Sequence, residues 1–200
     1  MDGGWNYAGT EQILGVGDFD GDGRQDFVIK SAGGIGTIKR DATGTLTHLN
    51  IVAFGSFWGT WGTNASDTLA GIGNVNGDGR DDLIWRSAWG MGINSRSATG
   101  AAVVLAGHPY GVWISGRWNF AASDSLPALG DFTGDGRTDL IIRSPWGVGL
   151  LAGTSTGPFS LITANPVFDL MGSWQVRAED QFLPVGDFDG DGRKDLFLQR

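Results

Sequence analysis

The sequence lacks cysteine altogether, and its 200 residues include only 2 histidines. The absence of cysteine excludes disulfide bonds and cysteine-based zinc sites, and it leaves the redox compartment open. The histidines, His48 and His108, fall at different places in the repeat described below, and no Ser/His/Asp or Cys/His arrangement is visible. Carboxylates outside that repeat are too few to nominate a glycosidase pair. We therefore expect no catalytic residues and a protein that is not an enzyme.

Long apolar runs and basic stripes are also missing. No apolar stretch approaches the length of a membrane span, so we expect a soluble domain. The 14 basic residues form no stripe, which argues against nucleic-acid binding. The sequence opens with Met1-Asp2-Gly3-Gly4 rather than a basic and apolar leader, so any secretion signal is removed or lies outside it.

What the sequence does contain is a nine-residue acidic motif that occurs four times. The copies begin at residues 18, 74, 131 and 187, so the spacing is 56 or 57 residues. They read DFDGDGRQD, NVNGDGRDD, DFTGDGRTD and DFDGDGRKD. Oxygen-bearing side chains occupy positions 1, 3, 5 and 9 of the motif, and glycine occupies positions 4 and 6.

This pattern suits a hard cation of the size of calcium, which takes about six to eight oxygen ligands from a tightly curled chain. The glycine at position 6 can adopt the left-handed backbone, and the carbonyl of the arginine at position 7 can then face the ion. Magnesium fits less well because it prefers few carboxylates and several waters. An EF-hand is excluded because its loop needs glutamate at position 12, where the first copy has Ile29.

The alternative interpretation is a glycine-rich hairpin turn that binds no ion. Four copies in register favour the metal site. In addition, 13 of the 22 carboxylates lie at ligand positions, and four divalent ions would cancel the formal charge of −8. The acidity therefore belongs to the metal loops rather than to the recognition of a basic partner.

Short apolar runs flank each motif and predict strands, in the first copy at residues 13–17 and 27–30. Third strands are expected at residues 35–39, 91–95 and 148–152, and fourth strands near 46–52, 102–106 and 159–162. Helical periodicity is absent, so the fold class is all-β. Units of four strands repeated every 40 to 60 residues or so are typical of antiparallel β-propeller blades.

We divide residues 1–200, a single propeller segment, into tandem repeats 1–56, 57–113, 114–169 and 170–200. The last repeat is truncated after its second strand, so three complete blades and a half blade are expected. A propeller needs about four to eight blades to close. Either the ring is partial, as a piece of a longer chain would be, or copies complete it as a homo-oligomer, most simply a dimer.

A Gly-x-Trp connector recurs thirteen residues before each motif, and an acid recurs seven residues before it at Glu11, Asp67, Asp124 and Asp180. Strand order places the metal loops on one rim, and the connectors on the opposite rim with the turns that carry Trp89 and Trp146. The tryptophans either wedge between blades or present a flat face to a sugar. The acids either bond sugar hydroxyls or cap backbone N–H groups of the connector.

With these motifs the chain resembles the integrin-like calcium propellers, the FG-GAP or VCBS repeats of integrin α subunits and of PVL-type fungal lectins. The resemblance rests on Asp-x-Asp-Gly-Asp-Gly-Arg-x-Asp between two strands and on the upstream Gly-x-Trp. It covers essentially the whole chain. It implies up to four structural Ca²⁺ ions, each held by side chains at positions 1, 3, 5 and 9 and by the carbonyl at position 7. The matching residues are Asp18, Asp20, Asp22, Arg24 and Asp26; Asn74, Asn76, Asp78, Arg80 and Asp82; Asp131, Thr133, Asp135, Arg137 and Asp139; and Asp187, Asp189, Asp191, Arg193 and Asp195. The second loop has the fewest carboxylates and is expected to bind calcium most weakly.

The same resemblance implies a secreted, extracellular lectin whose partners are glycans, bound in clefts between blades. The ligand-binding residues would be drawn from the aromatic rim, namely Trp5, Trp61, Trp89, Trp118, Trp146 and Trp174. Two alternatives stay open, a protein-binding adhesion scaffold of the integrin-head type and a non-catalytic fragment of a polysaccharide lyase.

Overall fold

The computed structural model describes residues 9–166, 170–171, 174–183 and 185–200, apart from the side chains of residues 170, 171 and 174. The prediction of an all-β chain is confirmed over these residues, which form strands and turns. None of the described segments is a helix that could cross a membrane. Contacts divide the chain into two compact units, Met1–Gly73 with Gly79–Gly107 and Asn74–Asp78 with His108–Arg200.

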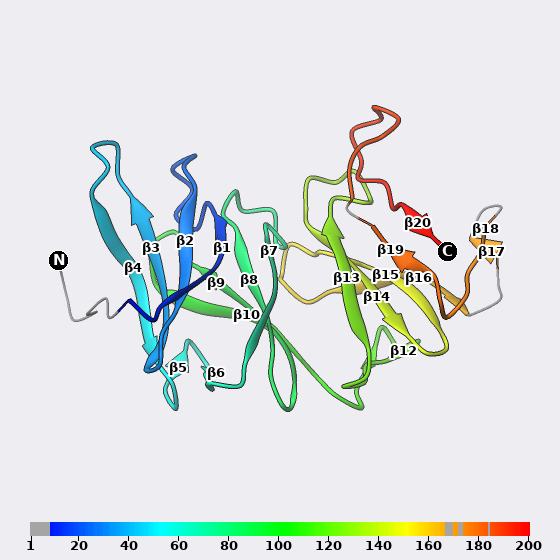
Figure 1. Cartoon of the computed structure of the whole chain (residues 1–200), viewed down its shortest axis with the longest axis horizontal. Coiled ribbons are helices and arrows are strands. Elements are labelled where there is room, and N and C mark those ends of the chain that lie inside the picture. The colour runs from blue at the N-terminus through cyan, green and yellow to red at the C-terminus, as the bar shows by residue number, and fades with distance from the viewer. Residues whose placement is uncertain (1–8, 167–169, 172–173, 184) are drawn as a thin grey trace. The chain divides into compact units, whose positions relative to one another are not determined.

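The first unit contains two four-stranded antiparallel sheets, here called blades one and two (Figure 1). Blade one consists of β1 (Gln12–Gly17), β2 (Asp26–Lys30), β3 (Gly34–Arg40) and β4 (Leu46–Ala53). Blade two consists of β7 (Thr68–Gly73), β8 (Asp82–Arg86), β9 (Gly90–Arg96) and β10 (Ala102–Pro109). The strands of each sheet follow chain order, so the β1–β2 and β3–β4 loops lie at one end of blade one and the β2–β3 turn at the other.

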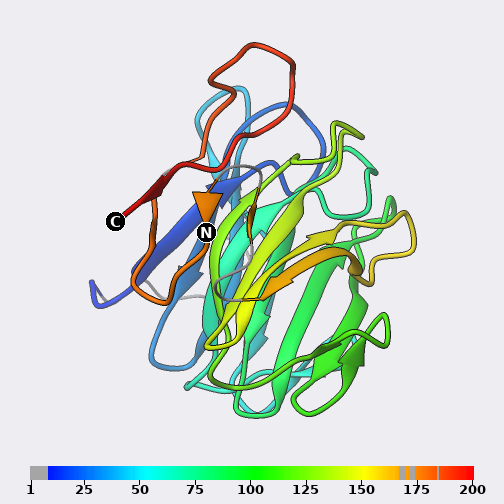
Figure 2. The same ribbon diagram turned by 90° about the vertical axis from the view of Figure 1, so that its right-hand side faces the viewer.

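The second unit contains blade three and the beginning of a fourth repeat. Blade three consists of β13 (Ser125–Gly130), β14 (Asp139–Ser144), β15 (Gly147–Ala152) and β16 (Ser160–Pro166), and Figure 2 shows its strands running side by side. The fourth repeat pairs β19 (Gln181–Phe182) with β20 (Leu198–Gln199) and forms an antiparallel bridge between Gly186 and Asp195. Three four-stranded sheets followed by smaller pairings confirm the predicted propeller blades.

The observed strand bounds agree closely with the predicted ones, since β2 and the third strands of blades one to three begin within one residue of the predicted positions. Two fourth strands, β10 and β16, extend further than predicted, to residues 109 and 166. The connectors that precede blade two, blade three and the fourth repeat each form a two-stranded hairpin that was not predicted. These hairpins pair β5 (Phe57–Trp58) with β6 (Trp61–Gly62), β11 (Trp113–Ile114) with β12 (Trp118–Asn119), and β17 (Leu170–Met171) with β18 (Trp174–Gln175).

The core of the first unit lies between its two blades. Ile72 of β7 packs against β1 so closely that a Cβ atom on Gly15 or Gly17 would lie 2.6 or 2.7 Å from its side chain. Side chains from both blades, among them Val28 and Leu83, share one buried cluster with Trp58 and Trp61 of the connector hairpin. Blade two covers one face of the blade-one sheet, so apolar residues of β2 such as Val28 are buried on that face.

Candidate functional site

Each acidic motif forms a tight loop between the first two strands of its repeat. The glycines at positions 4 and 6 of all four loops have φ values between 77° and 88°, a region that favours glycine. The left-handed backbone predicted for position 6 is therefore confirmed, and position 4 shares it. Side chains larger than glycine would strain both positions.

The side chain at position 1 organises the loop from within. Asp18 Oδ1 accepts a hydrogen bond from Gly21 N at 2.7 Å, and its Oδ2 accepts one from Gly23 N at 2.7 Å. Asp131 and Asp187 make the same pair of bonds in the third and fourth loops. A carboxylate has about four lone-pair sites, so these bonds leave it able to bind a cation as well.

Carboxylates converge most closely in the first and fourth loops. Oxygens of Asp18, Asp20 and Asp22 lie within 4.8 Å of one another, and so do oxygens of Asp187, Asp189 and Asp195. In the part of the chain that the structure describes, no other three acidic or histidine side chains meet this condition. Basic side chains partly offset the charge of the first cluster, since Lys39 Nζ lies 3.0 Å from Asp20 and Arg24 lies 2.7 Å from Asp22.

Asp26, at position 9 of the first loop, has one carboxylate oxygen that could bind a cation. Its Oδ2 accepts from Phe19 N at 3.1 Å, whereas its buried Oδ1 has no hydrogen-bond partner among the described residues. Burial raises the pKa of Asp26 to about 6, and the charges of Asp20, Asp22 and Asp18 add to this effect. A buried acceptor without a donor is costly, and a divalent ion beside it would remove that cost.

In the third loop the carboxylate at position 9 accepts hydrogen bonds on both of its oxygens. Asp139 Oδ2 accepts from the backbone N–H groups of Phe132 and Thr133, both at 2.9 Å, and Oδ1 accepts from Gly153 N at 3.0 Å. Burial also raises the pKa of Asp139. The backbone therefore already occupies both oxygens of this carboxylate.

The second loop is the poorest in carboxylates, as its sequence indicates. Asn74 Oδ1 accepts from Gly77 N at 2.8 Å and from Asp78 N at 3.0 Å. Its amide nitrogen cannot act as the second acceptor that aspartate supplies in the other loops. Asn76 Nδ2 donates to Asp78 Oδ2 at 3.2 Å. An amide replaces a negative ligand at both positions, which weakens the attraction for a cation.

The arginine at position 7 links consecutive loops, a role that sequence reasoning missed. Arg80 Nε donates to Arg96 O at 3.0 Å, and Arg137 Nε donates to Gly153 O at 3.2 Å. The stem of Arg80 covers Gly21 of the preceding loop, where an added Cβ would lie 3.2 Å from Arg80 Cγ. Arg137 covers Gly77 in the same way, at 3.1 Å. The repeated Gly and Arg of the motif thus form a packing contact as well as a turn.

The residue after this arginine adds a backbone bond at each of the same junctions. Its N–H donates to the position-1 carbonyl of the preceding loop, at 2.7 Å from Asp81 to Asp18, 2.8 Å from Thr138 to Asn74 and 2.7 Å from Lys194 to Asp131. The position-1 residue therefore bonds within its own loop through its side chain and to the next loop through its carbonyl.

On the opposite rim, the connector tryptophans Trp61 and Trp118 are buried, which disfavours the expectation that they contact a ligand. Their exposed fractions are 3% and 0%. Trp61 lies over Gly92 and Trp118 over Gly149, where an added Cβ would be 2.0 and 2.9 Å from the indole. Trp118 Nε1 donates to Asp124 Oδ2 at 2.9 Å. The interpretation that connector tryptophans pack against the blades is therefore favoured for these two rings.

Trp89 and Trp146, by contrast, are each 42% exposed. Each lies on a buried connector ring: the centroids of Trp89 and Trp61 are 4.3 Å apart and those of Trp146 and Trp118 are 4.1 Å apart, with interplanar angles of 40° and 41°. Blades two and three thus present the same tryptophan pair, with one ring buried and one half exposed. Trp5 and the side chain of Trp174 lie outside the described residues.

The recurring acids cap the connector backbone. Oδ2 of Asp67 accepts from Asn64 N at 3.0 Å, that of Asp124 from Ala121 N at 3.0 Å, and that of Asp180 from Arg177 N at 2.9 Å. All three side chains are buried. Of the two roles that the sequence left open, the structure favours capping over contact with a sugar.

Comparison with known proteins agrees with this architecture. Residues 12–49 match the FG-GAP repeat, and residues 131–198 match the FG-GAP-like repeat. No curated protein matches the sequence. Among solved structures, a lectin from Agrocybe aegerita that recognises non-reducing terminal N-acetylglucosamine is similar, with a TM-score of 0.57 and 21% identity. The match covers 92% of this chain and 45% of the lectin, so this chain spans less than half of the lectin's length. The chain is thus built from FG-GAP repeats, and its blades fold like those of a fungal lectin.

Proposed function

We propose that this protein is a carbohydrate-binding β-propeller segment that binds sugars on the exposed rings of Trp89 and Trp146. The observation that carries the proposal is the repeated pair, in which a half-exposed indole is held against a buried one. A flat aromatic face suits the C–H face of a sugar ring. Likeness to a lectin that recognises terminal N-acetylglucosamine supports the proposal and suggests the first sugar to test.

Both rings are held in place before any ligand arrives. Trp89 N donates to Ser87 Oγ and Trp146 N donates to Ser144 Oγ, each at 3.2 Å. The contact with the buried ring further restricts each side chain. A preorganised ring loses little conformational entropy on binding, which favours affinity. Two such rings per chain would also allow multivalent binding to a surface that carries many sugars.

We further propose that calcium binds in the acidic loops and has a structural rather than a catalytic role. Asp18, Asp20, Asp22 and Asp26 would hold the ion in the first loop, and Asp187, Asp189, Asp191 and Asp195 in the fourth. A bound ion would neutralise the repulsion among these carboxylates and supply the partner that Asp26 Oδ1 lacks. Loops of extracellular modules bind calcium at about 10⁻⁴ to 10⁻³ M, so occupancy would fit a secreted protein.

Substitution of the exposed rings tests the lectin function. We expect W89A with W146A to weaken binding to N-acetylglucosamine or to the sugar found on a glycan array by at least about tenfold, with circular dichroism showing that the variant is still folded at the assay temperature. W113A is the matched control because Trp113 is 57% exposed but lies on the β11 hairpin outside the pair. Equal binding by wild type and the double variant would refute the proposal.

A second candidate function, a protein-binding scaffold, is favoured by Phe57 and Trp113. They occupy equivalent positions on the β5 and β11 hairpins and are 66% and 57% exposed. Aromatic side chains are enriched at protein interfaces. If F57A with W113A abolishes binding to a protein partner while glycan arrays stay negative, this function replaces the lectin. The predicted homo-oligomer stays a prediction, which the solution mass in millimolar calcium would test.

A further inference from the structure

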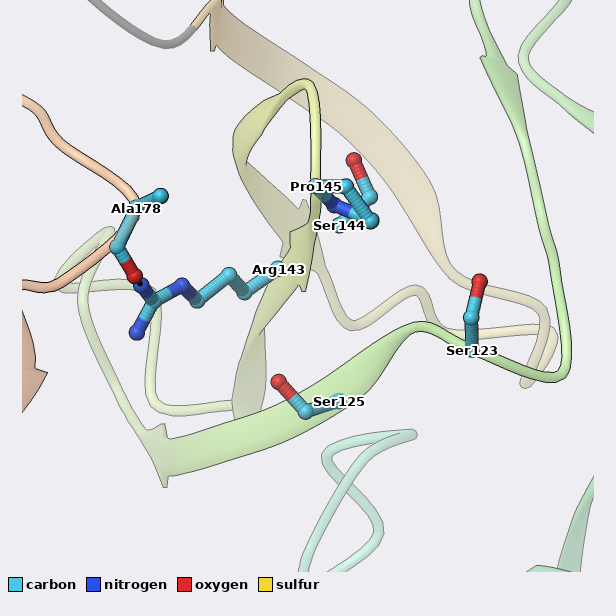
Figure 3. A pocket seen from close by; sticks show the side chains of 6 residues that line it. All are labelled: Ser123, Ser125, Arg143, Ser144, Pro145 and Ala178. Atoms are coloured by element: carbon cyan, nitrogen blue, oxygen red, sulfur yellow. Dashed lines mark hydrogen bonds between the residues drawn. The ribbon is translucent and has the colours of Figure 1, made fainter.

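An open cavity of about 250 Å³ lies at the surface of the second unit, on the rim of blade three that carries Trp146. Its walls are Ser123 and Ser125 at the start of β13, Arg143, Ser144 and Pro145 at the end of β14, and Ala178 of the fourth repeat (Figure 3). Clefts for drug-sized ligands measure roughly 300 to 1,000 Å³. The size therefore suits a smaller group, such as one sugar residue or its substituent.

Arg143 supplies the charge of this cavity. Figure 3 shows its side chain extending to Ala178, with the Ser125 hydroxyl pointing toward it. The guanidinium donates to the carbonyls of Asp180 and Ala178 and, at 3.5 Å, to that of Arg177. Guanidinium has five N–H donors, so three contacts leave two available. Among the described residues no carboxylate forms an ion pair with Arg143, so its partly buried positive charge has only neutral partners.

Hydroxyl groups surround this charge. Ser123 and Ser125 are exposed, and Ser144 is buried with its Oγ accepting from Trp146 N at 3.2 Å. A serine hydroxyl can donate one hydrogen bond to an anionic oxygen. The cavity therefore offers donors from three serines and one guanidinium and no carboxylate in its lining.

The cation recurs at the equivalent position of blade one. Lys30 Nζ donates to Ala65 O at 2.8 Å and to Asp67 O at 3.0 Å, and Lys30 is followed by Ser31 as Arg143 is by Ser144. Lys30 also has no ion pair with a carboxylate among the described residues. The fourth repeat has Gln199 at this position, which carries no charge. The chain itself thus supplies a lysine and a glutamine version of the site.

We infer that the cavity at Arg143 binds the oxyanion of an acidic sugar, either the carboxylate of a uronic acid or a sulfate ester. The inference rests on the proposed function, because Trp146 directly follows Ser144 and Pro145 and would hold the sugar ring. The Nε–H and one Nη1–H of Arg143 take no part in the three bonds to carbonyls, and each can donate a charge-assisted hydrogen bond to an oxygen of a carboxylate or sulfate. Serine donors complete the set, and the absence of acidic lining avoids repulsion. The site therefore selects acidic over neutral glycans.

Affinity ratios test this selectivity. The probes are N-acetylglucosamine, its 6-sulfate and glucuronic acid, measured by calorimetry at low and high salt. We expect wild type to bind one or both acidic sugars about tenfold more tightly than the neutral one, since charge-assisted bonds are strong. The ratio should fall at high salt because screening weakens exposed ionic contacts. In the W89A background, which leaves only the proposed site at Trp146, R143Q should bring this ratio close to one and R143K should keep part of the preference, with neutral binding unchanged in both.

Arg143 also bonds the connector of the fourth repeat, so its substitution could affect folding as well as ligand binding. A second variant separates these two effects. S123A with S125A changes two exposed hydroxyls, so we expect unchanged thermal unfolding and an acidic preference reduced about threefold. W146A should weaken neutral and acidic binding together, which reports on the proposed lectin function instead. A wild-type ratio of one, or a preference that persists in both R143Q and the double serine variant, overturns the inference.

Titration with simple anions tests the oxyanion site even if no neutral sugar binds and the lectin proposal fails. Inorganic sulfate and glucuronate are titrated into the folded chain while the Nε–H resonance of Arg143 is followed by NMR. A saturable shift that is absent in R143Q supports an oxyanion site. No shift with either anion overturns it, whatever the result with N-acetylglucosamine.

Discussion

The first and third acidic loops share one motif but complete it in different ways. Asp26 Oδ1 in the first loop is buried without a hydrogen-bond partner among the described residues, whereas the equivalent oxygen of Asp139 accepts from Gly153 N. Gly153 follows the end of β15, and at the equivalent place blade one has Arg40, still within β3. The difference teaches that one sequence motif can leave an oxygen of its position-9 carboxylate without a backbone donor or can pair both oxygens with the backbone.

The largest expected effect comes from breaking the backbone support of the third loop. An added Cβ on Gly153 would lie 2.5 Å from Val75 O and 2.6 Å from Thr138 O. These are backbone atoms, so the strand has to move and the bond to Asp139 is lost. We expect G153A to lower the free energy of unfolding by about 2 to 4 kcal/mol, measured by denaturant titration. G33A is the control because an added Cβ there meets nothing within 4 Å. A cost below that of G33A would show that Gly153 does not support the loop.

Replacing the position-9 aspartate by asparagine should stabilise the first loop but destabilise the third when calcium is chelated. D26N removes a buried charge whose pKa is raised to about 6, and we expect it to stabilise the chelated protein by roughly 1 to 2 kcal/mol. D139N replaces one of two accepting oxygens by a donor and should destabilise by about 1 to 2 kcal/mol. Thermal unfolding with chelator measures both. Equal signs for the two variants would show that the loops do not differ as described.

Calcium should stabilise the loops in the order of their carboxylates. For dissociation constants of about 10⁻⁴ to 10⁻³ M, 1 mM ion contributes roughly 0.4 to 1.4 kcal/mol per site. We expect the first and fourth loops to contribute most and the Asn74 loop least. N74D with N76D should strengthen the second site, as measured by calorimetry. Tighter binding by the wild-type Asn74 loop than by the Asp18 loop would contradict the order.

The smallest expected effect is the pH dependence of stability that comes from His108. Burial lowers the pKa of His108, whose Nε2 accepts from Phe159 N at 3.3 Å. His108 therefore binds a proton more readily in the unfolded chain than in the folded one. Its contribution to the stability of the folded state is complete above the ordinary histidine pKa of about 6.5 and is lost as the pH falls below that value. We expect wild type to lose less than about 1 kcal/mol relative to H108Q between pH 7 and 5, since the raised pKa of Asp26 acts in the opposite direction in both proteins. An unchanged pH profile in H108Q would assign the loss to other groups.

Much of this fold follows from local sequence patterns. An acidic turn between two apolar runs needs only neighbouring residues, so β1, β2 and the positive φ of Gly23 could be predicted. The burial of Trp61 was only one of two open interpretations, because it depends on Gly92 in another strand that leaves room for the indole. The Arg80 contact over Gly21 likewise joins residues of successive repeats. Spacing alone does not show which residues of neighbouring repeats come into contact.

The bonds between loops also bear on how such a chain arises. Asp81, Thr138 and Lys194 each donate a backbone N–H to the preceding repeat, so this link does not depend on their different side chains. The arginine over the preceding glycine is likewise encoded within every copy of the motif. A duplicated gene segment would therefore bring both halves of its own interface, and the array could lengthen without evolving new contacts.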